Sequence, residues 1–152
     1  MSRNLSNTQK PVRKTVSPLL GKLMAAEAEP NPLLLKPYVA LDALYRGKGS
    51  SGVVTMLGQH LIMSEQLCLA GFEQAQLAPV RQGHAALVRI DGHAKAGGAW
   101  IAEGQDYEAL RHALQVYERQ LRVAPSMQVR TAQTVIVNNL TALKPKPADQ
   151  QA

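Results

Sequence analysis

Three side chains that could do nucleophilic chemistry fall on one face of the most apolar stretch of the chain. His60, Ser64 and Cys68 follow one another at i, i+4 and i+8, the spacing that aligns side chains along a helix. A histidine beside a thiol can help to generate a thiolate nucleophile, provided that substrate reaches the sulfur and a third group orients the base. The surrounding apolar residues offer neither, so the pattern indicates a buried structural cysteine, and we expect no catalytic residue and no enzyme.

Two further histidines, His84 and His93, are candidate metal ligands by residue type. They lie nine residues apart on one predicted helix, so the second points to the side opposite the first. They cannot bind one metal ion together from that helix, and we expect no metal site and no cofactor. The single cysteine, Cys68, excludes an internal disulfide and fits a reducing compartment, so we expect the protein in the cytoplasm.

The loop of residues 46–52 could bind a phosphate. It offers two cations, glycines and hydroxyls, and it ends where a predicted helix begins with free N–H groups. The Walker pattern Gly-x4-Gly-Lys-Ser/Thr is absent. The same residues also suit helix capping, with Gly47 ending one helix and Ser50 or Ser51 beginning the next. Capping and anion contact are both open at this point.

The net charge of +6 lies almost entirely outside the segment predicted to fold. Five basic residues and no acid precede Glu27, whereas residues 27–143 carry ten basic and ten acidic side chains. A basic arm on a neutral body is weaker evidence for nucleic-acid binding than a basic domain would be. If nucleic acid or another anion is bound, we expect the contacts from this arm and the 46–52 loop, through Lys10, Arg13, Lys14, Arg46 and Lys48.

Candidate contacts to a protein partner lie nearer the C-terminus. Arg111 and Arg122 are three helical turns apart and share a face, where Glu118 can pair with Arg122. Trp100 follows two glycines in a connection between predicted helices, where a tryptophan either packs against the end of a bundle or anchors a partner. We therefore take Trp100, Arg111 and Arg122 as candidate partner contacts, with a solvated helix face and bundle packing as the alternatives.

The apolar spacing predicts an all-α protein, a single compact bundle of five to six helices with short connections. We expect helices over residues 18–28, from near Pro37 to Gly47, from Ser50 or Ser51 to about residue 71, over 76–96, through 110–121 and over 126–143. The third is apolar nearly all round, which predicts a central position. This domain would span residues 18–143, between disordered tails of residues 1–17 and 144–152. The most apolar window, residues 53–72, contains too many polar side chains to span a membrane, and we expect no membrane partner.

Four short motifs carry a resemblance to other proteins. They are Ala43-Leu44-Tyr45-Arg46-Gly47-Lys48-Gly49, Gly98-Ala99-Trp100, Glu108-Ala109-Leu110-Arg111 and Tyr117-Glu118-Arg119-Gln120-Leu121. Over roughly residues 38–124 the chain resembles a group of small, uncharacterised helical proteins from bacterial genomes and mobile elements, some of them automatically labelled as regulators of the factor-for-inversion-stimulation type. The resemblance implies a shared helical bundle.

Two classes of function follow. The first is a non-enzymatic protein-interaction module, an accessory or regulatory protein of a bacterial mobile element that binds a protein partner or a second copy of itself. The alternative is a DNA- or RNA-binding transcriptional regulator that uses the basic arm and the Arg46/Lys48 loop. Its affinity would fall steeply with salt, because its contacts would be to phosphates. The absence of a reactive cluster in the predicted bundle favours the first class.

Overall fold

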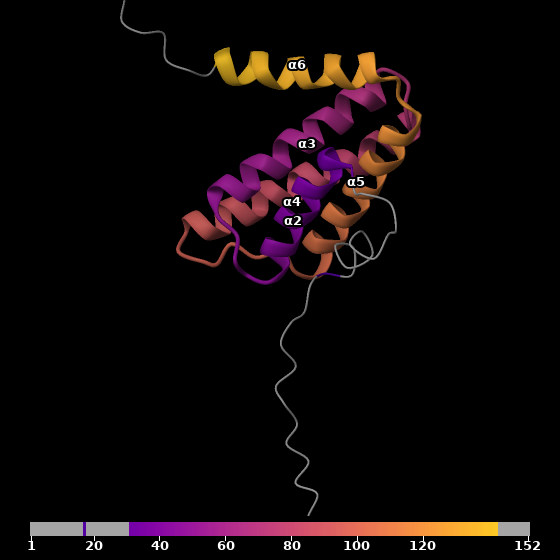
Figure 1. Ribbon diagram of the computed structural model, residues 1–152. Helices are drawn as coiled ribbons and strands as arrows, with labels where there is room; N and C mark the ends of the chain where they lie inside the picture. Colours follow the sequence, from indigo (N-terminus) through magenta and orange to yellow (C-terminus); the bar gives the residue numbers. More distant parts are fainter. Residues whose placement is uncertain (1–16, 18–30, 143–152) are drawn as a thin grey trace, which may run out of the picture.

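The computed structural model describes Ser17 and residues 31–142, with side chains as far as Asn138, and its regular structure there is entirely helical. The helices are α2 (Pro32–Tyr45), α3 (Ser51–Leu69), the 3-10 helix η1 (Gln74–Gln76), α4 (Leu77–Lys95), α5 (Gly104–Val123) and α6 (Ser126–Ala142) (Figure 1). The predicted all-α bundle is confirmed. The predicted helix over 18–28 and the tails, apart from Ser17, lie outside the described residues.

Helix α2 begins five residues before the predicted start at Pro37. The Asn31 side chain accepts a hydrogen bond from the Leu33 N–H at 3.0 Å, and Pro32 occupies the first helical position, where its missing N–H costs nothing. Pro37 therefore lies inside the helix rather than in its first turn, and it is buried. The prediction was wrong here because two prolines suited a helix start, and only the first stands beside a capping side chain.

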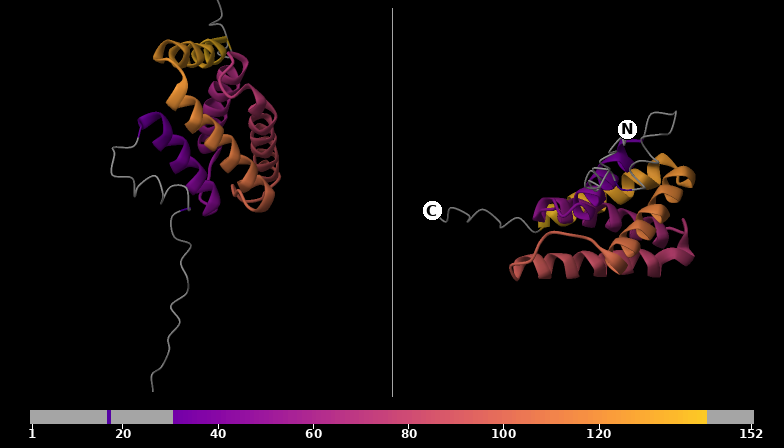
Figure 2. Two further views of the ribbon diagram at one scale, coloured as in Figure 1. Left: turned by 90° about the vertical axis from the view of Figure 1, so that its right-hand side faces the viewer. Right: turned by 90° about the horizontal axis from the view of Figure 1, so that it is seen from below.

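Helix α3 is the central element, as its apolar residues on all sides predicted. It packs against each of the other four α-helices, and Leu57, Leu61 and Leu67 are fully buried. Ser50 caps it by accepting a hydrogen bond from the Val53 N–H at 3.3 Å. The remaining helices are thus arranged around α3, which Figure 2 shows from two further directions.

Helices α4 and α5 form the most closely packed pair of the bundle. A Cβ atom added at Gly83 would lie 2.7 Å from the Cβ of Ala113 on α5, which is closer than two non-bonded carbon atoms approach in proteins. Glycine at position 83 therefore lets the two helices come together. Gly92, on the same helix, has no neighbour within 4 Å of such an atom, so close packing uses only the first of these two glycines.

Helix α6 lies across the end of the bundle at which α3 and α5 terminate (Figure 1). It packs mainly against α3, through the buried residues Val129, Ala132 and Ile136. These three positions form one stripe of the helix, so the opposite side of α6 faces away from the body.

Candidate functional site

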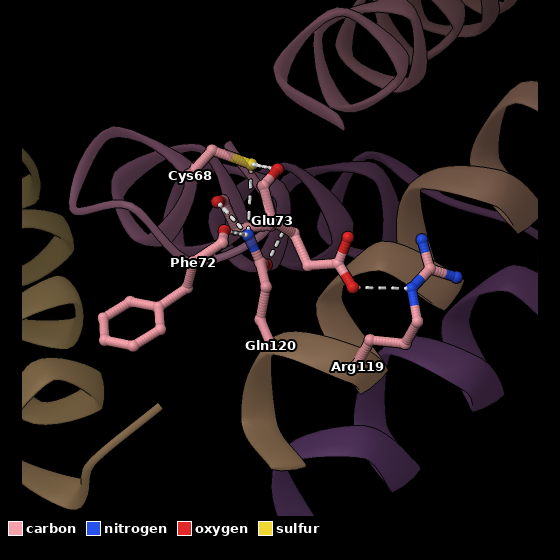
Figure 3. Close-up of polar contacts among 6 residues, drawn as sticks. Cys68, Phe72, Glu73, Arg119 and Gln120 are labelled. Atoms are coloured by element: carbon pink, nitrogen blue, oxygen red, sulfur yellow. Dashed lines mark hydrogen bonds and ion pairs between the residues drawn. The ribbon is translucent and has the colours of Figure 1, made fainter. Parts of the chain in front are cut away.

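A buried glutamine organises the polar contacts at this end of the molecule. Gln120 of α5 is fully buried, and its side-chain N–H2 group donates to the carbonyl oxygens of Ser64 and Phe72, both at 3.0 Å, and approaches the sulfur of Cys68 at 3.1 Å (Figure 3). Its carbonyl oxygen accepts the Ser64 hydroxyl at 2.6 Å. One side chain thus joins α5 to the last turns of α3 and to the segment after it.

Cys68 belongs to this cluster and is fully buried, as the structural interpretation predicted. Its thiol donates to the carbonyl oxygen of Glu73 at 3.4 Å, and burial raises its pKa, which keeps it protonated. His60 lies two helical turns and about 12 Å of helix axis away. The His60 ring is instead hydrogen-bonded to the Met56 carbonyl at 2.8 Å. His60 and Cys68 therefore form no thiol–base pair.

The turn after α3 is held by a second contact with α5. Glu73 adopts a left-handed backbone conformation, with φ of 57°, which is uncommon outside glycine. Its carboxylate accepts a hydrogen bond from Arg119 at 2.9 Å (Figure 3). Together with Gln120, this ion pair fixes the chain reversal between α3 and α4. The arrangement joins elements, and we find no group in it positioned to react with a substrate.

The 46–52 loop has the geometry of two helix caps. Gly47 has a positive φ of 70°, and the Lys48 N–H donates to the Ala43 carbonyl at 2.8 Å, which closes the end of α2 in a Schellman pattern. With Ser50 capping α3, the capping interpretation is confirmed. Arg46 lies 3.0 Å from Asp42, and Lys48 is exposed. Whether these two residues also bind an anion stays a prediction.

This loop is fastened to the connection between α4 and α5. The Gly49 N–H donates to the Trp100 carbonyl at 3.2 Å, and the Ala102 N–H donates to the Leu44 carbonyl at 2.9 Å. Trp100 is half-buried and packs against the core, as the packing interpretation predicted. A side chain at position 49 would collide with the Trp100 carbonyl, so glycine is required there by close approach.

The two candidate arginines of α5 are engaged in ion pairs. Arg122 lies 2.7 Å from Glu118, the predicted partner, and Arg111 lies 2.8 Å from Glu108. Glu118 also accepts the phenol of Tyr38 at 2.8 Å, and burial, together with this carboxylate, raises the pKa of Tyr38. Trp100 precedes the first turn of α5 and Arg122 lies in its last, so the structure does not bring these candidate contacts together.

Most basic side chains of the body are matched by an acid. Of the ten lysines and arginines within residues 31–138, seven pair with a carboxylate: Arg46–Asp42, Arg81–Glu65, Arg89–Asp106, Lys95–Asp91, Arg111–Glu108, Arg119–Glu73 and Arg122–Glu118. Lys36, Lys48 and Arg130 have no acidic partner within that range. The candidates Lys10, Arg13 and Lys14 lie outside the described residues.

The structure also shows a contact that the sequence analysis did not predict. Ser17, which we assigned to the tail, is fully buried, and its backbone N–H donates to Asp42 of α2 at 2.6 Å. Burial raises the pKa of Tyr107, an effect that the Ser17 side chain partly offsets. The one available signal was Asp42 itself, an acid placed among the apolar residues of its helix.

Within residues 31–138 and Ser17, no three His, Cys, Asp or Glu side chains come close enough together to hold a metal ion. His84 lies 3.7 Å from Glu65. Neither His84 nor His93 belongs to a group of side chains that could hold a metal ion. None of the described helices has the length and apolar character needed to cross a membrane. No protein-family model, no curated protein and no solved structure matches the chain.

Proposed function

We propose that this protein is a non-enzymatic protein-interaction module, which binds a protein partner or a second copy of itself through the end of the bundle formed by α6. The resemblance seen in the sequence supports an accessory or regulatory role in a bacterial mobile element, and the single buried cysteine is consistent with the cytoplasm.

One observation carries this proposal: large apolar side chains are exposed where α3 and α5 end and α6 begins. Leu69, Val123 and Met127 are 57%, 64% and 77% exposed, and we call these three residues the apolar corner. Leu69 and α6 line one shallow depression, and Val123 and Met127 flank the short turn between α5 and α6. Grouped exposed apolar residues are typical of sites that contact another protein.

The charge of α6 supports the same conclusion. Of its seventeen residues only Arg130 is charged. A surface helix with a single charge on its outer face forms an interface at low desolvation cost, because only one ion has to leave water. The outer face instead carries threonines whose hydroxyls bond back to the helix, as Thr131 and Thr134 do.

The experiment compares partners captured by the native chain with those captured by two variants. Val123→Asp/Met127→Asp places two carboxylates in the apolar corner. We expect this variant no longer to capture the partner protein or, if the native chain forms a dimer in sedimentation velocity, no longer to form that dimer. Val88→Asp is the matched control, because Val88 is 72% exposed on α4, away from the corner. Equal capture by all three forms would refute the proposal.

The alternative of a DNA- or RNA-binding regulator predicts a different result. In that case both variants would bind nucleic acid as well as the native chain does. The logarithm of the affinity would fall linearly with the logarithm of the salt concentration. Lys36, Lys48 and Arg130 are the cations of the described body that remain available for such contacts.

A further inference from the structure

The outer side of α6 carries a row of exposed side chains at the spacing of a helix-pairing seam. Met127 is 77% exposed, and Thr131, Thr134 and Asn138 are exposed as well. Steps of four, three and four residues keep these side chains on one line, as at the a and d positions of a coiled coil. We call these residues the α6 seam. No described element packs over it, because α6 lies across the end of the bundle with this side facing away (Figure 1).

The α6 seam can be buried at little polar cost, although two of its residues are threonines. The Thr131 hydroxyl donates to the Met127 carbonyl and the Thr134 hydroxyl to the Arg130 carbonyl, both at 2.9 Å. The two hydroxyl groups therefore donate inside the helix, and their methyl groups are left to contact a neighbour. No residue of the seam is charged. Asn138 brings a side-chain amide, with which a facing asparagine can pair.

The two flanks of the seam differ in character. On one flank Leu69, at the end of α3, lines a shallow depression together with Gln128 and Val135 of α6, and Leu69 is 57% exposed. On the other flank Arg130 lines a separate depression between α6, the end of α5 and the start of α2. Arg130 has no acidic partner within the described residues. One flank thus offers exposed apolar surface, and the other offers a long cationic side chain.

These flanks complement each other when two copies of the chain pair through parallel α6 helices. In a parallel pair, each flank of one helix meets the opposite flank of the other. The aliphatic part of Arg130 then lies against Leu69 and Val135 of the second copy, while its guanidinium stays in water at the edge. The two Arg130 side chains are on opposite sides of the pair. Asn138 faces Asn138 of the second copy, so their amides can bond to each other.

An antiparallel pair would lose these matches. It brings like flanks together, so the two Arg130 side chains would share one side of the pair, and α6 has no acid to place between them. It would also set the Asn138 amide against the Met127 side chain, which is a poor hydrogen-bond partner. Charge and polar pairing therefore favour the parallel arrangement.

From the uncharged seam and its complementary flanks, we propose that α6 pairs in parallel with α6 of a second copy, which gives a two-fold symmetric homodimer. This inference rests on the proposed function, because it names the occupant of the same end of the bundle. The seam extends over about 16 Å of helix, which is short for an interface between proteins, so the dimer is weak and forms in the micromolar range.

Sedimentation velocity of the full chain tests the proposal. Between about 5 µM and about 500 µM we expect the sedimentation coefficient to rise about 1.5-fold, as monomer becomes dimer. Thr131→Asp/Thr134→Asp places like charges opposite one another in the seam and should keep the chain monomeric throughout this range. Gln82→Asp/Ala85→Asp is the matched control, because it adds the same charges at the same spacing on exposed positions of α4, and it should still dimerise.

Two further measurements separate a loss of pairing from a loss of folding and determine the orientation. A mixture of Thr131→Asp/Thr134→Asp with Thr131→Lys/Thr134→Lys should dimerise again, because opposite charges then face each other across the seam. Thr134→Cys should give a disulfide-linked dimer in air with copper phenanthroline, because a parallel pair places position 134 opposite itself. Ala85→Cys on α4 should not, and the native Cys68 is buried.

Three outcomes would overturn the inference. The first is a native chain that stays monomeric at about 500 µM; if that monomer captures another protein that Val123→Asp/Met127→Asp does not, the proposed function stands without the homodimer. The second is a dimer that persists in Thr131→Asp/Thr134→Asp. The third is a Thr134→Cys protein that is not cross-linked, while an equal mixture of Thr131→Cys and Thr134→Cys is, because the pair would then be antiparallel.

Discussion

At the scale of single residues, the hydrogen-bond network of Gln120 is a feature that apolar periodicity does not reveal. Gln120 falls between Tyr117 and Leu121 in the apolar stripe of α5, where a buried amide requires partners from elsewhere in the chain. Those partners are carbonyl and hydroxyl groups on α3 and its following turn, more than forty residues away. The sequence predicted the stripe but not this network, because its partners are fixed only by the packing of α5 on α3.

Replacing this side chain should therefore cost much more than replacing an exposed glutamine of the same helix. Gln120→Ala leaves a cavity, and it leaves the Ser64 hydroxyl and the Phe72 carbonyl without their partner, so we expect the free energy of unfolding to fall by about 3 kcal/mol. Gln105→Ala, at an exposed position of α5, should change it by less than about 0.5 kcal/mol. Urea denaturation of both variants measures the difference, and similar values would contradict the role of Gln120.

We expect His60 to make the stability of the protein depend on pH. Burial lowers its pKa below the ordinary value of 6.5, with Lys36 adding to the effect and the bond to Met56 opposing it. The unfolded chain then binds the proton more readily than the native one, so stability is present above the unfolded pKa and is lost as the pH falls through it. We expect the free energy of unfolding to decrease between pH 7.5 and pH 5.5, and to decrease less in His60→Gln. An identical pH profile for the two proteins would show that His60 is not the cause.

At the scale of helices, the bounds of α3, α4 and α6 could be predicted within about two residues, whereas α5 begins at Gly104, six residues before the predicted apolar pattern. Their apolar residues repeat at helical spacing, and glycine, proline and serine stand at their ends, so local sequence determines them. The start of α2 could also have been chosen from residue types, because Asn31 before Pro32 is a favourable N-cap and Lys36 before Pro37 is not. The role of Gly83 cannot be predicted from the sequence, because whether a glycine weakens a helix or allows close packing depends on the neighbouring helix.

Gly83 and Gly92 form a matched pair within α4. Gly83→Ala should destabilise the protein by about 1–3 kcal/mol, because the added methyl group meets Ala113 and α5 must move. Gly92→Ala has open space around it and should stabilise the protein by about 0.5–1 kcal/mol through its higher helix propensity. Thermal or urea unfolding gives both values, and shifts of the same sign would show that α4 and α5 are not in such close contact.

At the scale of the whole molecule, the pairing of charges limits what the body can bind. Seven of its ten cations are matched by acids, so few are available for a phosphate backbone. Individual exposed pairs add little stability. Together these pairs leave the body with little surplus charge, and this near-neutrality was predictable by counting residues. The apolar corner was not predictable in this way, because it depends on how three helix ends meet.

We accordingly expect nucleic-acid binding to follow the N-terminal arm. If the full chain binds duplex DNA, its affinity should fall with salt as expected for about five phosphate contacts. A version that begins at Glu29 should lose this binding. Mobility shift at two salt concentrations measures both. Equal binding by the two forms, with a preference for one sequence, would require a groove-reading surface on the helices and would favour the regulator over the interaction module.

The attachment of α6 to a single main neighbour has a consequence for biosynthesis. Helices α2 to α5 precede α6 in the chain, and they pack against one another without it. Once residues 32–123 have left the ribosome, they can therefore assemble this four-helix core while α6 is still inside the exit tunnel. Until α6 emerges, the residues of α3 that pack against it stay uncovered, so we expect α6 to join the bundle late, on a surface that is already formed.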